Sequence, residues 1–491
     1  MASDQLHEAI YQRYIEPTRR KRTRAVGLEF EFPIMNAETK PVDFSVIHAM
    51  TDDFLRTFSF LPSGQDDAGH IYLAEEPETG DSLSFDCSYN TLEFSFGTEE
   101  DMALLDQRFR RYYRFVQNEL EKNGHHITGM GINPGYAVNR NVPVVSERYR
   151  MLFHHLCSYK NYGREILFHD HPNFGLFSCA SQVQLDVEEA DLIEVINTFT
   201  LLEPMKALLL ANSLWTEDTN EFLCSRDYFW RNSLHGLNRH NVDMYGLRFE
   251  SVEELILYIR SMSIYCVMRD GKYVNFSPIP LDDYFASDTI EGEIFQGSRY
   301  EKIRIHPELS DLEYLRSFKF EDLTFRGTVE FRSVCEQPVP EILASGALHA
   351  GLMENLHALT DLLENDHVIY HRGYNASEIR RQFVMSDLPA VYDRKELTEL
   401  LLKILDLAAD GLKIRCTDLN FLSIPDPEPG TVFRCQAKIR YHHPAVAATV
   451  TVTGDDNVLV RFDTPVRAPA PGQSAVFYDD DRCVIGGGII A

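Results

Sequence analysis

Four segments of this chain alternate apolar and polar residues with a period of two. They are residues 26–33, 91–97, 179–187 and 328–334. A period of two sends successive side chains to opposite faces of a strand, so each segment is predicted to be a β-strand, with the first ending at Pro33. In each, one face is apolar and the other carries mostly carboxylate or amide groups.

Longer segments between these strands carry helical patterns. They are residues 101–123, 192–213 with a kink expected at Pro204, 340–365, and a stretch that begins after Asp393. Asp393 followed by Glu396 is a capping-box signature, and Gly411 is the expected residue just beyond that helix. Because strands and helices do not alternate strictly, the pattern predicts an α+β fold with an antiparallel sheet.

The pattern changes near residue 424. Residues 425–430 read Pro-Asp-Pro-Glu-Pro-Gly, and short apolar-polar runs follow at 432–441, 447–453, 458–462 and 473–478. Short strands separated by turns every 8–12 residues are typical of a small barrel or sandwich. We therefore predict a boundary at 424–430, which divides the chain into a domain of residues 1–424 and a domain of residues 425–491.

Composition narrows the functional classes. The 491 residues include 47 Lys and Arg against 75 Asp and Glu, a formal net charge of −28. Such a charge disfavours binding to nucleic acid or to anionic lipid, and an anionic substrate would need a local positive site or a metal. The nine cysteines show no framework spacing, and there is no apolar 18-residue stretch or secretory segment, so we expect a cytoplasmic protein with reduced thiols and no membrane partner.

The polar faces of the four strands are the candidate site. Each strand alone could be the wet outer side of a sheet, but together they concentrate oxygen-bearing groups at Glu29, Glu31, Gln182, Gln184 and Glu330. Asp86 and Glu93 lie seven residues apart, which places them on opposite faces of a continuous strand, whereas a hairpin at the turn-like residues 87–90 would bring both inward. Converging carboxylates repel one another and need cations.

Hard oxygen ligands favour Mg²⁺ or Mn²⁺, and these ions accompany ATP phosphates. The chain contains neither a P-loop nor a G-x-G-x-x-G motif. The basic run Arg19, Arg20, Lys21, Arg22 and Arg24 is either a phosphate-binding segment or a solvated lead-in to the first strand.

The strand motifs resemble a known family. Gly27-Leu28-Glu29-Phe30-Glu31, Asp86 with Glu93-Phe94, residues 179–185, and Val329-Glu330-Phe331-Arg332 resemble, in this order, the signature of glutamate–cysteine ligases. The resemblance covers about residues 20 to 360. It implies the fold of the carboxylate–amine ligases, which is of the glutamine-synthetase type.

The resemblance also implies roles for individual residues. The metal ligands would be Glu29, Glu31, Asp86, Glu93 and Glu330. Gln182 stands where members of the family have a metal-binding His or Gln, and Gln184 stands where Asn is common. Arg332 matches an active-site arginine near the phosphoryl group or a substrate carboxylate, and Arg226 matches an arginine that binds substrate.

The implied reaction is ATP- and magnesium-dependent. Glutamate would be activated as γ-glutamyl phosphate and joined to the amine of cysteine, a step of glutathione-type thiol biosynthesis. Another acceptor amine remains open, as does the oligomeric state. The implied partners are small-molecule substrates.

The C-terminal segment has a separate resemblance. Residues 438–441, 458–463, 471–478 and 483–489 resemble the C-terminal β-barrel of tRNA-specific 2-thiouridylases, although no catalytic half of such an enzyme precedes them. Residues 425–491 contain six Lys and Arg against eight Asp and Glu, a net charge of −2, whereas a tRNA-binding surface is expected to be basic. Two interpretations follow. Either the barrel is a reused module that does not bind RNA, or the protein is non-catalytic and uses the barrel to dock tRNA or a sulfur carrier.

Overall fold

The structure is a computed structural model of the chain. It describes all residues except 1–2, 24, 101, 163–167, 367–368, 371–372, 413, 440–444, 455, 464–465, 467–471 and 481. The predictions made for Arg24 and for residues 440–441 and 471 fall outside the described residues.

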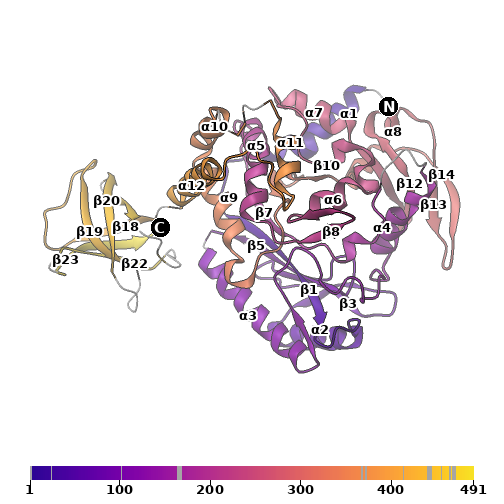
Figure 1. Ribbon diagram of the computed structural model, residues 1–491, viewed down its shortest axis with the longest axis horizontal. Helices are drawn as coiled ribbons and strands as arrows, with labels where there is room; N and C mark the ends of the chain where they lie inside the picture. Colours follow the sequence, from indigo (N-terminus) through magenta and orange to yellow (C-terminus); the bar gives the residue numbers. More distant parts are fainter. Residues whose placement is uncertain are drawn as a thin grey trace.

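A large antiparallel sheet with strands of different lengths forms the centre of the main body (Figure 1). Its strands run in the order β16-β17-β7-β1-β5-β4-β3-β2, and β6 also pairs with β1. They are β1 (Val26–Asn36), β2 (Leu61–Gln65), β3 (Ile71–Glu75), β4 (Ser82–Ser84), β5 (Thr91–Glu99), β6 (His125–Ile127), β7 (Ser181–Asp186), β16 (Glu321–Leu323) and β17 (Thr328–Phe331). Every pairing in this sheet is antiparallel, as the sequence predicted.

Strand β1 shows how the alternating pattern produces two different faces. Phe30 and Phe32 are fully buried, and their rings lie 5.4 Å and 5.9 Å from the ring of Phe109 on α3 (Met102–Glu121). Glu29 and Glu31 therefore project from the opposite face. The predicted end at Pro33 is wrong: β1 continues to Asn36, because its last residues pair with β6 rather than with β7.

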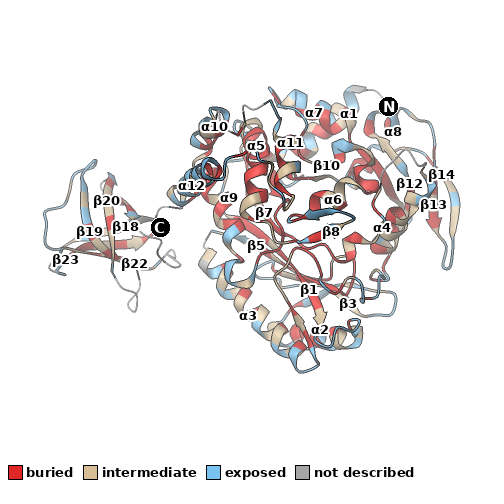
Figure 2. Ribbon diagram, viewed as in Figure 1, coloured by how far each residue is buried: buried red, intermediate tan, exposed pale blue. Residues whose placement is uncertain are grey.

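Helices cover the apolar face of the sheet and form one continuous core with it (Figure 2). Helices α2 (Phe44–Phe58), α3, α5 (Leu192–Leu209) and α9 (Ala344–Glu354) contact strands of the sheet. Helices α10 (Leu356–Glu364), α11 (Ala376–Phe383) and α12 (Arg394–Gly411) pack on α5 and α9. Pro204 lies inside α5 as expected. The single helix predicted over 340–365 is instead divided at Asn355 into α9 and α10.

The predicted start of α12 is confirmed, since the Asp393 side chain accepts hydrogen bonds from the backbone amides of Lys395 and Glu396. Gly411, however, is not the residue beyond the helix but its last residue. A Cβ atom at Gly411 would lie 1.9 Å from the carbonyl oxygen of Gly351 on α9. The glycine is therefore required by the close approach of two helices and not by a left-handed turn.

A second antiparallel sheet lies beside the main one (Figure 1). It runs in the order β11 (Ser263–Arg269), β12 (Lys272–Pro280), β13 (Ile290–Phe295) and β14 (Tyr300–Ile305). Helix α4 (Glu147–Cys157) contacts β12, and α7 (Val252–Ser261) and α8 (Leu281–Ala286) pack nearby. Helix α6 (Arg226–Arg231) and the short strand β10 (Val242–Asp243) precede this second sheet in the chain, and the short strand β15 (Phe318–Lys319) follows it.

The C-terminal segment forms a closed barrel with its own apolar core (Figure 2). Its strands run in the order β18-β21-β20-β19-β22-β23. They are β18 (Ile414–Phe421), β19 (Val432–Lys438), β20 (Val446–Gly454), β21 (Asn457–Phe462), β22 (Ser474–Tyr478) and β23 (Val484–Ile490).

The barrel begins earlier than the sequence predicted. Strand β18 precedes the predicted boundary at 424–430 and pairs with both β21 and β23. The Pro-rich residues 425–430 therefore connect two barrel strands rather than two domains. Within the described part of the chain, no helix is long and apolar enough to cross a membrane.

Candidate functional site

Three carboxylates from different parts of the main sheet converge. Glu31 lies on β1, Glu93 on β5, and Asp86 in the turn that joins β4 to β5. One ligand oxygen from each lies within 4.8 Å of those from the other two. Strand β4 pairs with β5 so that Ser84 faces Glu93, and Cys87 at the turn has a positive φ of 59°. The hairpin that the sequence left open is therefore present, and it brings Asp86 to the face that carries Glu93.

A second polar group lies along β1, β7 and β17. Gln182 donates from Nε2 to Glu29 at 3.2 Å and to Glu31 at 3.0 Å. Gln184 donates to Glu29 at 3.1 Å and to Glu330 at 3.4 Å. The two glutamines thus link all three strands, because the register places Glu29 opposite Gln182 and Glu330 opposite Gln184. Glu29 and Glu330 lie outside the group of Glu31, Asp86 and Glu93.

Arg332 extends this group beyond the end of β17. Its guanidinium donates to Glu330 at 2.8 Å, and a quarter of the side chain remains exposed. Asp322, opposite Glu330 on β16, is a member of this group that the sequence did not single out. Burial raises the pKa of Asp322 to about 7, although the positive charge of Arg332 opposes that shift.

Arg226 reaches the same region from α6, far away in sequence. It is buried, donates to Ser178 Oγ at 3.0 Å, and lies 3.4 Å from the backbone oxygen of Arg332. Its positive charge lowers the pKa of Glu31 against the effect of burial. The structure therefore brings both predicted arginines to the carboxylate-bearing face.

The carboxylates of this site disfavour being ionised together. Burial, and then the charge of Asp86, raise the pKa of Glu31 to about 8 and that of Glu93 to about 7. Burial, followed by Glu330, raises the pKa of Glu29 well above its ordinary value. Each shift favours the neutral form, as expected where like charges share a poorly solvated surface. A cation among them would reverse that preference.

The donor set fits a hard divalent cation. Glu31, Asp86 and Glu93 supply carboxylate oxygens and no sulfur or imidazole ligand, which suits Mg²⁺ or Mn²⁺. Beside them, Gln182 Oε1 is a buried oxygen without a hydrogen-bond donor among the described residues. By contrast, Gln184 Oε1 accepts from Arg326 at 2.8 Å. Gln182 is thus the amide whose oxygen is free for a ligand, and Gln184 holds its neighbours in place.

Two further residues at the site escaped the sequence analysis. Arg148, on α4, carries a positive charge that lowers the pKa of Glu93, partly opposing burial and Asp86. Glu336 is fully buried and accepts from Ser181 Oγ at 2.9 Å and from the backbone amide of Glu31 at 3.2 Å. Neither lies on an alternating strand, so the period-two pattern could not find them.

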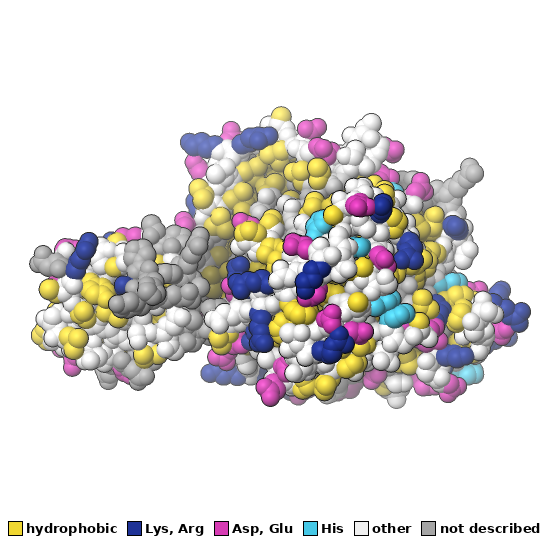
Figure 3. All heavy atoms as spheres, turned by 90° about the horizontal axis from the view of Figure 1, so that it is seen from below, with side chains coloured by type: hydrophobic (Ala, Val, Ile, Leu, Met, Phe, Trp, Pro, Cys, Tyr) yellow, Lys and Arg dark blue, Asp and Glu magenta, His cyan; other side chains and the backbone are white. Residues whose placement is uncertain are grey.

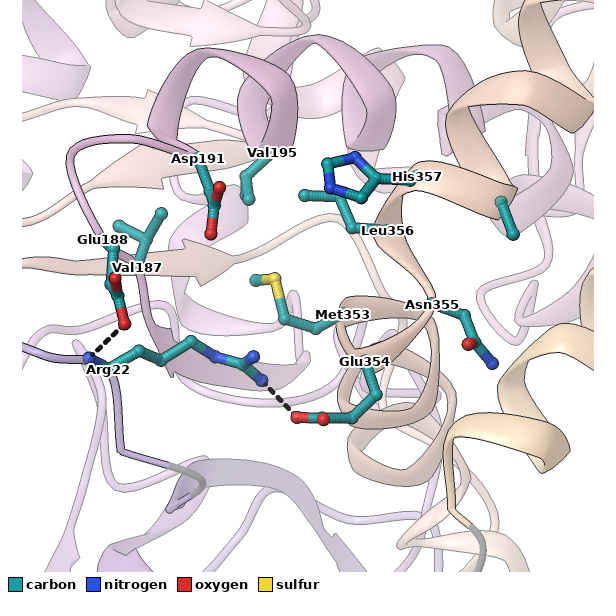
Figure 4. A pocket seen from close by; sticks show the side chains of 11 residues that line it. Arg22, Val187, Glu188, Asp191, Val195, Met353, Glu354, Asn355, Leu356 and His357 are labelled. Carbon is teal, nitrogen blue, oxygen red and sulfur yellow. Dashed lines mark hydrogen bonds and ion pairs between the residues drawn. The ribbon is translucent and has the colours of Figure 1, made fainter. Parts of the chain in front are cut away.

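The basic run near the N-terminus is paired with carboxylates. Arg20 contacts Asp186 at 2.7 Å, and Arg22 contacts Glu354 at 2.8 Å. Arg22 also borders a cavity of about 430 Å³ between the end of β7 and the α9–α10 junction (Figure 4). Asp191 and Glu188 lie on its wall, and none of the predicted site residues lines it. These contacts favour the structural interpretation of the run over a phosphate-binding one.

Comparison with protein families identifies the main body. A model described as glutamate-cysteine ligase family 2 matches residues 25–378, which is more than half of the chain. Together with the antiparallel sheet and its carboxylate-bearing face, this match defines the protein as an enzyme of the carboxylate–amine ligase class. The chain belongs to glutamate-cysteine ligase family 2.

The C-terminal barrel has its own relatives. A model described as aminomethyltransferase beta-barrel domain matches residues 412–490, in agreement with the early start of the barrel at β18. The tRNA-specific 2-thiouridylase MnmA of Pectobacterium carotovorum is 56% identical over 66 residues, which are 13% of this chain and 18% of that protein. MnmA 2 of Geobacillus kaustophilus is 44% identical over 77 residues, 16% of this chain and 20% of that protein. The chain thus covers about a fifth of the length of these relatives.

Remote similarity to two solved structures was also found. The ligase PafA in complex with the prokaryotic ubiquitin-like protein Pup is 10% identical, with a TM-score of 0.33 over 82% of this chain and 60% of that chain. A bifunctional glutathione synthetase from Pasteurella multocida is 12% identical, with a TM-score of 0.31 over 83% of this chain and 49% of that chain.

Proposed function

We propose that this enzyme joins the γ-carboxylate of glutamate to the amine of cysteine at the expense of ATP, with Mg²⁺ or Mn²⁺ as cofactor. The observation that carries the proposal is the convergence of Glu31, Asp86 and Glu93 within 4.8 Å, on the sheet face that also carries Arg332. Family membership supports the choice of glutamate and cysteine. The product would be γ-glutamylcysteine, a precursor in glutathione-type thiol biosynthesis.

In the proposed reaction, a γ-carboxylate oxygen of glutamate attacks the γ-phosphorus of ATP, and the bond from that phosphorus to the ADP oxygen breaks. The cysteine nitrogen then attacks the acyl carbon of γ-glutamyl phosphate. Phosphate leaves, and the nitrogen loses a proton as the amide forms. No step needs a protein nucleophile, so catalysis would consist of positioning and electrostatic stabilisation.

The residues of this chain would have distinct tasks. Glu31, Asp86 and Glu93 would hold one divalent cation, and Glu29 and Glu330 are the proposed ligands of another. A bound cation supplies positive charge that offsets the ATP phosphates. Arg332, fixed by Glu330 at 2.8 Å, presents a planar pair of donors to the transferred phosphoryl group.

Arg226 would bind a substrate carboxylate. It is buried, and Ser178 holds one of its terminal nitrogens at 3.0 Å. Glu31 lies close enough to this guanidinium for the two charges to interact. A substrate carboxylate bound there would lie beside the proposed metal group, as glutamate must during phosphorylation. Gln182 and Gln184 would keep Glu29, Glu31 and Glu330 oriented through the four amide hydrogen bonds described above.

The test is phosphate release from ATP, Mg²⁺ and glutamate, screened across amino-acid amines, with the product identified by mass spectrometry. We expect release to depend on the amine, with cysteine giving γ-glutamylcysteine. 2-Aminobutyrate, a sulfur-free analogue of cysteine, separates recognition of the thiol from recognition of the amine. Turnover with another amine but not with cysteine would change the assigned acceptor. No amine-dependent release at all would refute the proposal.

A tRNA-docking role for the barrel is less well supported. The similarity to tRNA-specific 2-thiouridylases favours it, but residues 425–491 carry a net charge of −2. On the face of the molecule shown in Figure 3, Lys and Arg side chains are interspersed with Asp and Glu rather than gathered into a basic surface. The phosphate backbone of a tRNA would be only weakly attracted to such a surface.

A further inference from the structure

A cavity of about 240 Å³ lies between the C-terminal half of α4 and strands β12 and β13. His154 and His155 contribute from α4, Asn275 from β12, and Glu293 from β13. None of the residues assigned to the ligase site lines it. The cavity is smaller than most drug-sized pockets, which suits a single small metabolite.

Asn275 is the most unusual residue of this cavity. Only 5% of it is exposed, yet neither Oδ1 nor Nδ2 has a hydrogen-bond partner in the described structure. A buried carboxamide without partners costs free energy, and such groups are rare in folded proteins. Because Asn275 lines the cavity, its amide is an unused donor–acceptor pair at the cavity wall.

His155 adds a second unused group. It is 3% exposed, and its Nε2 has no partner among the described residues. The ring is fixed by stacking on Tyr265 at a centroid distance of 4.0 Å. Burial lowers its pKa well below 6.5, so the imidazole is neutral. A neutral ring nitrogen offers one hydrogen bond to an uncharged partner.

The rim of the cavity is charged, whereas its interior is neutral. Glu293 contacts His154 Nε2 at 3.0 Å and is 44% exposed. Lys302, on β14, lies opposite Glu293 in the strand register and lines the same cavity. The nearly buried Phe276 supplies an apolar wall. A ligand here would bury a neutral, hydrogen-bonding end and leave its polar or charged end outside.

We propose that this cavity binds the adenosine portion of an adenine nucleotide. An Asn side chain pairs with the N6 amine and N7 of adenine through its oxygen and its nitrogen, and His155 Nε2 would bond to a further ring atom. The Glu293 carboxylate is suited to the ribose hydroxyls, and Lys302 to a phosphate. Binding of adenosine requires neither glutamate nor metal, so the binding test can fail or succeed independently of the proposed ligase reaction.

The nucleotide has two sources. It is either the ATP consumed by the ligase or a separate nucleotide that binds beside it. Helix α4 carries Arg148 near Glu93 and His155 seven positions further on, a distance of about 10 Å along a helix. The same adenosine chemistry serves both cases, and a kinetic measurement separates them.

The experiment measures binding of adenosine to the full-length protein by calorimetry, in buffer without metal. We expect saturable binding that weakens at least tenfold with inosine, which lacks the N6 amine. Asn275→Leu should reduce adenosine affinity at least tenfold while the melting temperature is unchanged or higher, because a buried amide without partners is removed. Asn118→Leu, on an exposed position of α3, is the matched control and should bind normally.

Lys302→Met should weaken AMP binding several-fold without changing adenosine binding. If the cavity holds substrate ATP, Asn275→Leu also raises KM for ATP at least tenfold; if it holds a separate nucleotide, KM for ATP is unchanged while adenosine binding is lost. Equal adenosine binding by the parent and Asn275→Leu, or no binding by the parent at millimolar adenosine, would overturn the proposal.

Discussion

At the scale of single residues, Glu330 has two contacts that constrain its role. It accepts from Arg332 at 2.8 Å and from Gln184 at 3.4 Å, and it is only 6% exposed. It thus connects the proposed metal-binding face to the arginine that would meet the phosphoryl group. Substitutions at the two ends of this pair test the two proposed roles separately.

Glu330→Gln is expected to abolish ligation and to leave the fold intact. The amide keeps an acceptor for Arg332 but loses the negative charge that a cation requires, and one of several repelling carboxylates disappears. The measurements are ligation at saturating Mg²⁺ and the melting temperature without metal. The control is Glu399→Gln on the exposed side of α12. Retention of most of the parental turnover would exclude Glu330 as a metal ligand.

Arg332→Lys is expected to lower kcat by an amount equivalent to about 2–4 kcal/mol, as for the loss of another transition-state donor. A guanidinium offers two coplanar donors, whereas an ammonium acts as a point charge. Comparison of kcat at saturating substrates with Arg299→Lys, an exposed ion pair with Glu301, measures the effect. A near-parental kcat would place Arg332 outside the reacting centre.

At the scale of secondary-structure elements, the site depends on how strands and helices are joined. The hairpin of β4 and β5 presents Asp86 and Glu93 to β1. Helix α6 is fixed by α11, because Arg380 Nε donates to Asp227 at 2.7 Å and its Nη1 donates to Glu203 on α5 at 2.6 Å. Both junctions lead to predictions.

Without metal, the carboxylate group should make stability decrease as pH rises. The folded-state pKa values of about 8 for Glu31 and about 7 for Glu93 exceed their ordinary values. Their stabilising effect is therefore fully present below about pH 4.5 and is lost as pH rises through 7 and 8.

Thermal unfolding in EDTA from pH 5 to pH 8 measures this effect. Glu31→Gln should flatten the decrease, and Mg²⁺ should raise the melting temperature more at pH 8 than at pH 5. The same pH slope in the parent and in Glu31→Gln would show that this group does not titrate as described.

Arg380→Met should destabilise the protein by about 3–5 kcal/mol, because it leaves the buried Asp227 without its arginine and leaves the buried Glu203 with Lys206 as its remaining cation. All four side chains are at most 9% exposed. Arg381→Met is the matched control, since Arg381 is the exposed next residue of the same helix. Urea unfolding of both variants gives the difference. Equal stability of the two variants would show that the buried ion network is replaceable.

At the scale of the whole molecule, the barrel and the ligase body have separate apolar cores. In Figure 1 the barrel lies beyond α12, at one end of the long axis. We propose that the two parts fold independently and that the chemistry belongs to the ligase body. The early start of the barrel determines how this proposal is tested.

A fragment of residues 1–411 is expected to stay soluble and retain ligation, whereas a fragment of residues 1–423 is expected to aggregate. The longer fragment keeps β18 without its partners β21 and β23, and an unpaired strand edge promotes association. Light scattering and ligation assays compare the two fragments.

The separate piece of residues 412–491 should fold and bind tRNA no more tightly than a neutral control protein across a salt series. A folded but inactive 1–411 fragment would show that the barrel completes the active site. Tight and steeply salt-dependent tRNA binding by the 412–491 piece would restore the tRNA-docking interpretation.

Much of the architecture is a local property of the sequence. The alternation around Glu29 and Glu31 predicts a strand with an apolar and an acidic face, because a strand repeats every two residues whatever its neighbours are. The Asp393 cap is equally local. By contrast, Asn355 divides a helix that the sequence predicted to be continuous, and Gly411 serves a contact with Gly351 that only the packing of α9 on α12 creates.

The candidate site shows the same division. The sequence by itself determined the residues on the strands, Glu29, Glu31, Gln182, Gln184 and Glu330, because their spacing fixes the face they occupy. Only the tertiary structure decided that Asp86 joins Glu93, that Arg226 and Arg148 reach the carboxylates, and that Asn275 and His155 lie unpartnered in a second cavity. Those features arise where segments distant in sequence exclude water together, and neither burial nor a missing hydrogen bond is encoded in local periodicity.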